Sequence, residues 1–175
     1  MLVAPREVHD LVFRCARIAG LDAGAADRAG RNVTYSEVHF GGAVATFASV
    51  LADPQRLLAE YGNGPDALVL AEVEARAKGI GSAVFASGVP LAALGSGIAD
   101  ITGRGLGVEG VPIGATGTTL VDVLQVGGPA MPVDDAAGSR AAREGLVVDR
   151  AAFSALTEAA KAYLVSETIL DGIED

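Results

Sequence analysis

One short segment of the sequence brings together side chains that could perform acid–base chemistry. A phenol, a hydroxyl, a carboxylate and an imidazole are followed closely by a glycine pair, in the order Tyr35, Ser36, Glu37, His39, Gly41 and Gly42. An imidazole can take up a proton near neutral pH, and a neighbouring carboxylate can orient it and raise its basicity. The glycines leave the backbone free of side chains that would obstruct a ligand.

This segment predicts two kinds of site residue. We expect His39 and Glu37 to be catalytic. The flanking positions are expected to bind a ligand, and they are Tyr35, Ser36, Gly41 and Gly42. The alternative is a helix end at which Glu37 and His39 simply face water.

A second candidate acid or base lies in an apolar segment. Asp122 interrupts the run TTLVDVLQV, whose threonine and valine content is typical of a strand. If side chains alternate along that strand, Asp122 shares a face with Leu120 and Leu124. A carboxylate among apolar groups is the environment of a tuned acid or base, so Asp122 is the third predicted catalytic residue. The alternative is that Asp122 faces solvent.

Other motifs predict no cofactor and no metal. The glycine-rich segment GLGVEGVPIGATGT matches neither the dinucleotide fingerprint nor a phosphate loop, and it lacks the lysine that a phosphate loop requires. Cys15 is the single cysteine and lies on an apolar stripe, so we expect a buried, unreactive thiol. The acid pair Asp134 and Asp135 has no third oxygen ligand at regular spacing, which favours solvated loop charge over a cation site.

Composition and charge limit the class of protein and its partners. Of the 175 residues, 50% are hydrophobic and 20% are charged, which excludes a disordered or low-complexity chain. The net charge of −9 and the lack of a Lys/Arg cluster argue against nucleic acid and against an anionic membrane. The start, MLVAPREVHD, has no apolar stretch typical of a signal peptide. We therefore expect a cytoplasmic protein.

Helical spacing dominates the first part of the chain. The patterns predict a helix over 5–19, a second capped by Asp22 and interrupted at Gly41, and a third reaching about Leu51. Asp53 and Pro54 then predict a short helical turn ending near residue 61, and GNGPD predicts a loop. We expect one domain over 1–175, with a helical part over 1–62 and a sheet-containing part over 66–175.

The second part alternates helical and strand patterns. A helix with Glu72 outside is expected to end at Gly79, before a buried strand over 80–87, a helix opened by Pro90, and strands over 106–115 and 117–128. A loop, a short helix over 135–144 and a last helix capped by Asp149 follow. A helix between two apolar strands is typical of a crossover unit. The predicted fold class is α/β (α+β), with N-terminal helices followed by a mixed sheet on which helices pack.

Two segments together resemble the malate/L-lactate dehydrogenase family of the type unrelated to Rossmann enzymes. They are LVFRCARIAGLDAGAADRAGRNVTYSEVHFGGAVATF, which is similar to that family's opening helix pair, and ARAKGIGSAVFASGVPLAALGSGIADITGRGLGVEGVPI, which is similar to its helix–strand–helix–strand segment. The family's Ser-His-Gly motif falls by position on Gly41, Gly42 and Ala43, and its Asn-His pair falls on Val89 and Pro90. Both histidines are therefore absent, and so is the portion that helps to hold the nicotinamide.

The C-terminal third resembles a different group. GLVVDRAAFSALTEAAKAYLVSETILDG is similar to the end of a short uncharacterised bacterial family with a Val-Pro-x-Ser/Thr-Glu motif. Val165, Ser166 and Glu167 match that motif, and its proline is missing. Together the resemblances imply a shortened relative of the dehydrogenase fold without the redox site, and not an NAD(P)-dependent dehydrogenase.

Three functions remain open at this point. The first is an accessory or small-molecule-binding protein of bacterial metabolism, and the second is a hydrolase, lyase or isomerase that uses His39 with Glu37 or Asp122 as acid and base. The third is a subunit that completes a partner enzyme's site. Because the resembled family is dimeric, we expect a homodimer, with the C-terminal helix as the candidate contact.

Overall fold

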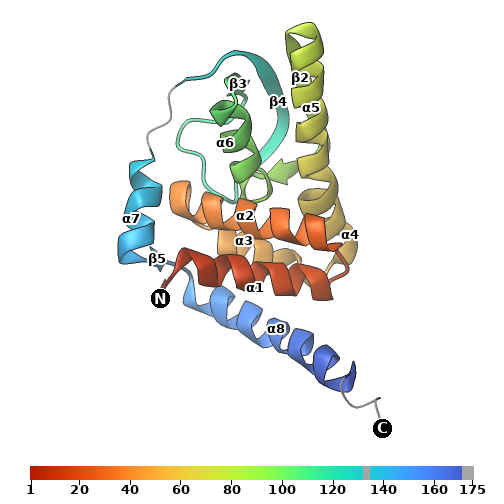
Figure 1. The fold of residues 1–175 in the computed structure, drawn as a ribbon, viewed down its shortest axis with the longest axis vertical. Coiled ribbons are helices and arrows are strands. Elements are labelled where there is room, and N and C mark those ends of the chain that lie inside the picture. The colour runs from red at the N-terminus through yellow and green to blue at the C-terminus, as the bar shows by residue number, and fades with distance from the viewer. Residues whose placement is uncertain (132–134, 171–175) are drawn as a thin grey trace.

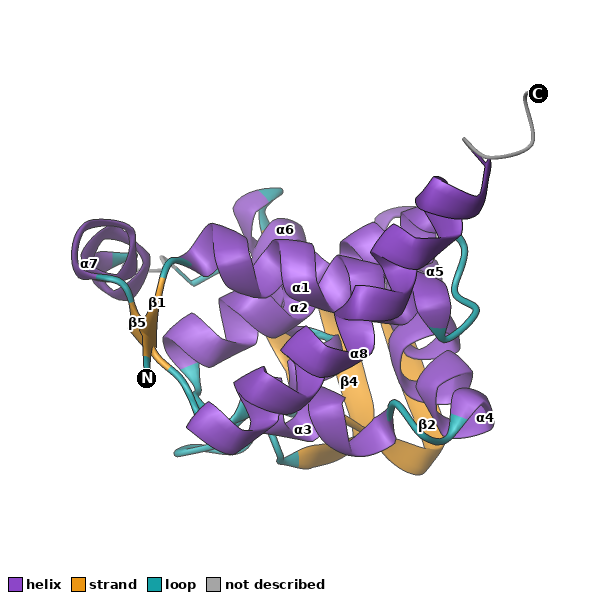
Figure 2. Ribbon diagram, turned by 90° about the horizontal axis from the view of Figure 1, so that it is seen from below, coloured by secondary structure: helices purple, strands orange, loops and turns teal. Residues whose placement is uncertain are grey.

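The first three helices of the chain pack together with the distant last helix on one side of the molecule. They are α1 (Pro5–Ile18), α2 (Ala23–His39), α3 (Ala43–Val50) and α8 (Arg150–Leu170), and α8 lies across α1 and α3 (Figures 1 and 2). The computed structural model describes residues 1–131 and 135–170, with the backbone alone for 164–170. Asp22 and Asp149 accept backbone hydrogen bonds from Ala25 and Ala152 at 2.8 and 2.7 Å, which confirms both predicted N-caps.

A continuous helical rod replaces the predicted GNGPD loop. α4 (Pro54–Leu57) runs into a π-helical turn, η1 (Leu58–Asn63), and then into α5 (Gly64–Lys78). The loop prediction is wrong because Pro65 does not end this helix. Pro65 has no N–H for an α-helical bond, and the wider π turn lets the chain pass the proline without leaving the helix.

The main sheet has three strands. β2 (Ile80–Pro90), β3 (Leu106–Glu109) and β4 (Leu120–Pro129) are ordered β2-β4-β3. Helices pack on this sheet, which confirms the fold class (Figure 1). Its pairings in the described residues are antiparallel, so the expectation of a mixed sheet is wrong. β2 and β3 do run in the same direction, as a crossover requires, but β4 lies between them and opposes both.

One face of the sheet is covered by α5 and by α6 (Gly95–Gly103), which follows a 3₁₀ turn, η2 (Leu91–Ala93). The helix predicted from Pro90 begins later, because β2 extends to that proline. α5 comes so close to β2 that a Cβ on Gly81 would lie 2.0 Å from the carbonyl oxygen of Ala71. Glycine is therefore required there for helix and strand to touch.

The opposite face of the sheet carries uncovered side chains. The register pairs Ser82 with Gln125 and Val84 with Val123, and all four side chains are exposed together with Ile80. This exposed sheet face carries no charge at those five positions. It is one of the places where large apolar side chains of the described residues are exposed.

A small second sheet ties the N-terminal residues to the segment that precedes α8. β1 (Leu2–Val3) pairs with β5 (Leu146–Val147), which follows α7 (Ala136–Glu144), and the terminal amine donates to the carbonyl of Val148 at 2.7 Å. One cluster of buried apolar residues joins the helical and sheet-containing parts. Among the described residues, no helix is long and apolar enough to cross a bilayer.

Candidate functional site

The predicted acid–base segment forms the last two turns of α2, and the helix divides its side chains between two faces. Residues four apart share a face of a helix. Tyr35 and His39 accordingly stack, with ring centroids 4.0 Å apart and an interplanar angle of 24°. Ser36 and Glu37 are buried instead.

Ser36 is engaged in packing. Its hydroxyl is fully buried and donates to the carbonyl of Leu91 at 2.8 Å. A Cβ on Gly95 would overlap that hydroxyl, so α2 and α6 meet closely at this point. The hydroxyl proton predicted to serve a ligand is already used within the protein.

Glu37 is directed to the next helix and not to His39. Its Oε2 accepts from the backbone N–H of Val44 at 2.8 Å, in the first turn of α3. The open N–H groups of a helix start attract a carboxylate, and this contact stabilises α3. Glu37 and His39 are two positions apart, so the helix turns them away from each other.

His39 faces a different acid, Asp135. The distance from Nε2 of His39 to Oδ1 of Asp135 is 3.5 Å, and the His39 side chain is 14% exposed. Burial lowers the pKa of His39, and the Asp135 carboxylate opposes that shift. The same carboxylate, after burial, helps to raise the pKa of Tyr35. Asp135 therefore does more than carry solvated loop charge, whereas Asp134 lies outside the described residues.

A cavity of about 430 Å³ opens beside this group. Its lining consists of Tyr35, Ala99, Thr102, Gly103, Ala130, Met131 and Asp135. One phenol, one carboxylate and one threonine hydroxyl therefore meet mostly small or apolar side chains. The His39 and Asp135 pair, and not His39 with Glu37, is the acid–base arrangement that the fold offers.

The glycine pair shapes the turn between α2 and α3. Gly41 and Gly42 have φ angles of +71° and +74°, a left-handed conformation that other residues adopt at a cost. The carbonyl of Gly41 accepts from the N–H of Gly117 at 2.8 Å. The turn explains both glycines, and their role in binding a ligand stays a prediction.

Asp122 is exposed on β4, so the prediction that it lies among apolar groups is wrong. The register moves from Val84 opposite Val123 to Val89 opposite Val121, because β2 bulges between those pairs. This bulge breaks the alternation on which the prediction depended. Neither Asp122 nor His39 lines the 770 Å³ cavity described next.

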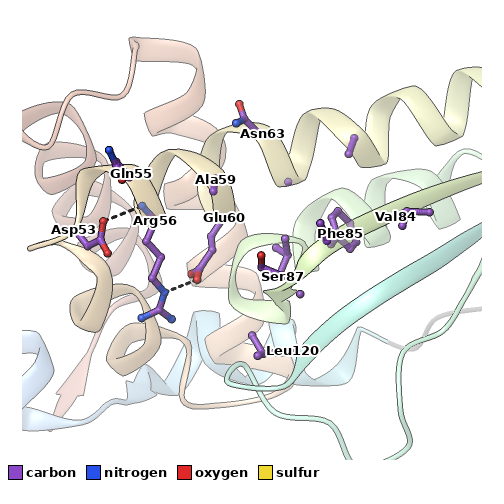
Figure 3. A pocket seen from close by; sticks show the side chains of 15 residues that line it. Asp53, Gln55, Arg56, Ala59, Glu60, Asn63, Val84, Phe85, Ser87 and Leu120 are labelled. Atoms are coloured by element: carbon purple, nitrogen blue, oxygen red, sulfur yellow. Dashed lines mark hydrogen bonds and ion pairs between the residues drawn. The ribbon is translucent and has the colours of Figure 1, made fainter.

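A cavity of about 770 Å³ lies between the helical rod and the bulge of β2 (Figure 3). Its walls are Asp53, Gln55, Arg56, Ala59, Glu60, Asn63, Gly64, Ala67, Val84, Phe85, Ala86, Ser87, Gly88, Val89 and Leu120. We call it the rod–bulge cavity. Its volume is within the range of sites that hold small molecules.

The helical wall of the rod–bulge cavity carries an ion pair. Nε of Arg56 donates to Oε1 of Glu60 at 2.5 Å, and Asp53 caps the rod by accepting from the N–H of Arg56 at 3.0 Å (Figure 3). The Glu60 side chain is only 9% exposed, whereas that of Arg56 is 47% exposed. Oε2 of Glu60 is buried and has no hydrogen-bond partner among the described residues. A buried acceptor without a donor is unusual and needs a cause.

The opposite wall is mainly apolar. The bulge turns at Gly88, whose φ is +69°, and it adds the Ser87 hydroxyl to a surface made by Val84, Phe85 and Val89. The cavity thus has a charged side on the rod and an apolar side on the sheet.

Sequence reasoning did not select Arg56 or Glu60. An Arg and a Glu four positions apart on a helix usually form a surface pair, and nothing local indicates that Glu60 is buried. The one available signal was Pro65 inside an otherwise helical pattern, because π turns occur often at functional sites.

No protein-family model, no curated protein and no solved structure matches the chain. The resemblance to the malate/L-lactate dehydrogenase family remains a prediction. Among the residues that the structure describes, no group of three or more His, Cys, Asp or Glu side chains could hold a metal ion. Cys15 is buried, and burial raises the pKa of its thiol to about 11, which agrees with an unreactive thiol.

Proposed function

We propose that the protein binds a small metabolite in the rod–bulge cavity, as a non-redox relative of the malate/L-lactate dehydrogenase fold with an accessory role in bacterial metabolism. The observation that carries this proposal is Glu60, a buried carboxylate at the cavity wall with one oxygen left without a donor. An unsatisfied buried polar group costs about 1–3 kcal/mol, which a ligand's N–H or O–H would recover.

The resemblance adds support for binding without hydride transfer. Val89, on which the family's Asn-His pair falls by position, lines the rod–bulge cavity. An apolar side chain there can contact a ligand but cannot exchange a proton with it. The position that would carry chemistry in a dehydrogenase thus belongs, in this chain, to a binding wall.

A thermal-shift screen of a metabolite library tests the proposal, with two variants as controls. Ala59 is exposed and lines the cavity, so Ala59→Trp fills the cavity without disturbing the core. Ala77 is an exposed alanine near the end of α5, outside that lining, so Ala77→Trp is the matched control. We expect a compound that stabilises the parent and Ala77→Trp but not Ala59→Trp. If no compound behaves in this way, the proposal fails.

An enzyme is the second candidate, a hydrolase, lyase or isomerase of a small metabolite. It is favoured by the stack of Tyr35 on His39, which faces Asp135 beside the 430 Å³ cavity. In this candidate the carboxylate that acts with His39 is Asp135. Glu37 accepts from the N–H of Val44 instead, and Asp122 is exposed on β4.

A subunit that completes a partner enzyme's site is the third candidate, favoured by the exposed sheet face of Ile80, Ser82, Val84, Val123 and Gln125. We propose that this face also serves a homodimer in the cytoplasm. Its neutral side chains suit association of two copies that each carry a net charge of −9.

A further inference from the structure

We infer that the ligand of the rod–bulge cavity is a free α-amino acid with an apolar side chain. The inference rests on the proposed function and names the ligand class of the same site. Three features of the wall lead to it: a guanidinium whose terminal NH₂ groups have no described partner, a carboxylate paired with it that keeps one oxygen without a donor, and an apolar surface opposite.

The cation is the Arg56 guanidinium. Among the described residues only its Nε has a protein partner, the Glu60 carboxylate, so both terminal NH₂ groups can donate. A guanidinium donates in a planar fork that matches a carboxylate. Arg56 therefore suits the carboxylate of a ligand.

The anion is Glu60, which accepts hydrogen bonds and can donate none as a carboxylate. Its buried Oε2 has no donor among the described residues. Glu60 lines the rod–bulge cavity, and the terminal torsion of a glutamate is broad, so its carboxylate can turn an oxygen toward a ligand. An ammonium supplies the missing donor and the opposite charge.

The contact between Arg56 and Glu60 fixes how the two ligand charges must be spaced. Since Nε of Arg56 and Oε1 of Glu60 are 2.5 Å apart, the guanidinium and the carboxylate are direct neighbours, so the ligand groups bound by the NH₂ groups and by Oε2 must also be close together. In an α-amino acid the ammonium and the carboxylate share one carbon. An ω-amino acid separates them by several carbons and cannot serve both side chains as well.

The net charge of the cavity lining argues against a ligand whose only charged group is a carboxylate. Its charged side chains are Asp53, Arg56 and Glu60, which sum to −1. A ligand with a carboxylate alone would meet this excess negative charge, whereas a zwitterion brings a compensating ammonium. The remaining body of the ligand packs on Val84, Phe85 and Val89.

Isothermal titration calorimetry on the full chain tests the class with four probes of similar apolar size. L-leucine carries both charges on one carbon, isopentylamine carries only the ammonium, 4-methylpentanoate only the carboxylate, and 6-aminohexanoate carries both far apart. We expect L-leucine to bind at least tenfold more tightly than each of the other three.

Two variants assign the charges to residues. Glu60→Gln should remove the preference for L-leucine over 4-methylpentanoate, and Arg56→Gln should remove the preference over isopentylamine. Glu74 and Lys78 form an exposed pair at 2.8 Å with the same spacing on α5, outside the cavity lining. Glu74→Gln and Lys78→Gln should therefore keep the parent's preferences. Circular dichroism checks folding, and the probe series on the parent decides the class even if Glu60→Gln does not fold.

Several outcomes would overturn the inference. Equal binding of L-leucine and any single-charge probe, or preferences that survive both Glu60→Gln and Arg56→Gln, would do so. If no probe binds while a library compound is lost in Ala59→Trp, the ligand class is wrong and the cavity is still a binding site. If neither the probes nor the library bind there, both proposals fail.

Discussion

His39 lies between the ring of Tyr35 and the carboxylate of Asp135. Removing the His39 ring should therefore lower the stability of the fold measurably. We expect His39→Ala to lower the free energy of unfolding by about 1 kcal/mol, because the aromatic stack disappears. His39→Phe keeps a ring and should lose less. Urea denaturation measures both. A change below about 0.5 kcal/mol in His39→Ala would mean that the ring is merely solvated.

The same residue links stability to pH. Because burial lowers the folded-state pKa of His39 from its usual 6.5, the neutral ring is favoured in the folded state. The contribution of the neutral ring to the free energy of unfolding is present above pH 6.5 and is lost as the pH falls through the lowered pKa.

If the enzyme candidate holds, any turnover found should fall by about 10²–10⁴-fold in His39→Ala.

Glu72 gives a second pH dependence, at a site that the sequence places on the surface. Hydrogen bonds from Arg104 and Arg76 lower the pKa of its carboxyl to about 2 although the side chain is buried. Its contribution to stability is present above pH 4.5 and is lost as the pH falls through about 2. We expect Glu72→Gln to lower the free energy of unfolding at pH 7 by about 2 kcal/mol and to flatten its dependence on pH below 4.5.

The control for Glu72→Gln is Glu74→Gln, which removes a carboxylate from the exposed pair with Lys78. Exposed pairs contribute little, so this variant should unfold like the parent. Equal losses in the two variants, measured by urea denaturation at pH 7, would contradict the structural role of Glu72.

At the scale of elements, the contact between α5 and β2 depends on one glycine. A Cβ on Gly81 would lie 2.0 Å from the carbonyl oxygen of Ala71, so Gly81→Ala must push helix and strand apart. We expect a loss of about 3 kcal/mol in the free energy of unfolding, measured by urea denaturation. A Cβ added to Gly103 in α6 would meet no atom of the described residues within 4 Å, so Gly103→Ala should be neutral or stabilising. If Gly81→Ala unfolds with the same free energy as the parent, α5 and β2 are packed less tightly than the structure describes.

Elements whose signals are local could be predicted, and elements set by distant contacts could not. The caps at Asp22 and Asp149 act three residues ahead, so the starts of α2 and α8 follow from the sequence. The insertion of β4 between β2 and β3 depends on pairing across about forty residues, and no local pattern encodes it. The bulge of β2 has the same origin, and it exposes Asp122.

In the candidate site, too, the local contacts could be predicted from the sequence and the distant contacts could not. The helix period alone puts Tyr35 beside His39 and separates His39 from Glu37, so this part was within reach of the sequence. Asp135 comes to His39 from almost a hundred residues away, and Arg104 reaches Glu72 from the residue that follows α6. The π-helical turn η1, which carries Glu60, likewise packs on the distant helix α2. These contacts form only when the chain folds.

At the scale of the whole molecule, the described side chains of α8 do not offer their apolar stripe to a partner in the way we predicted. Leu156 and Ala160 are buried, and α8 packs on α1 and α3 within the chain. Val84 and Val123 remain exposed on the sheet face opposite α5, where β2 is an edge strand. An edge strand with an apolar face can pair with another copy, so this face replaces α8 as the expected dimer contact.

Self-association through this face predicts a particle of twice the 17.6 kDa chain mass in light scattering coupled to size exclusion. Val123→Lys should reduce it to the single chain, because a charge on each copy would be buried against the other. Val147→Lys, at an exposed strand valine on the small second sheet, should leave the dimer intact. Since two copies at −9 repel each other, salt should strengthen the dimer, whereas a contact made of ion pairs would weaken in salt. A 17.6 kDa particle at every concentration and salt level would rule out the dimer.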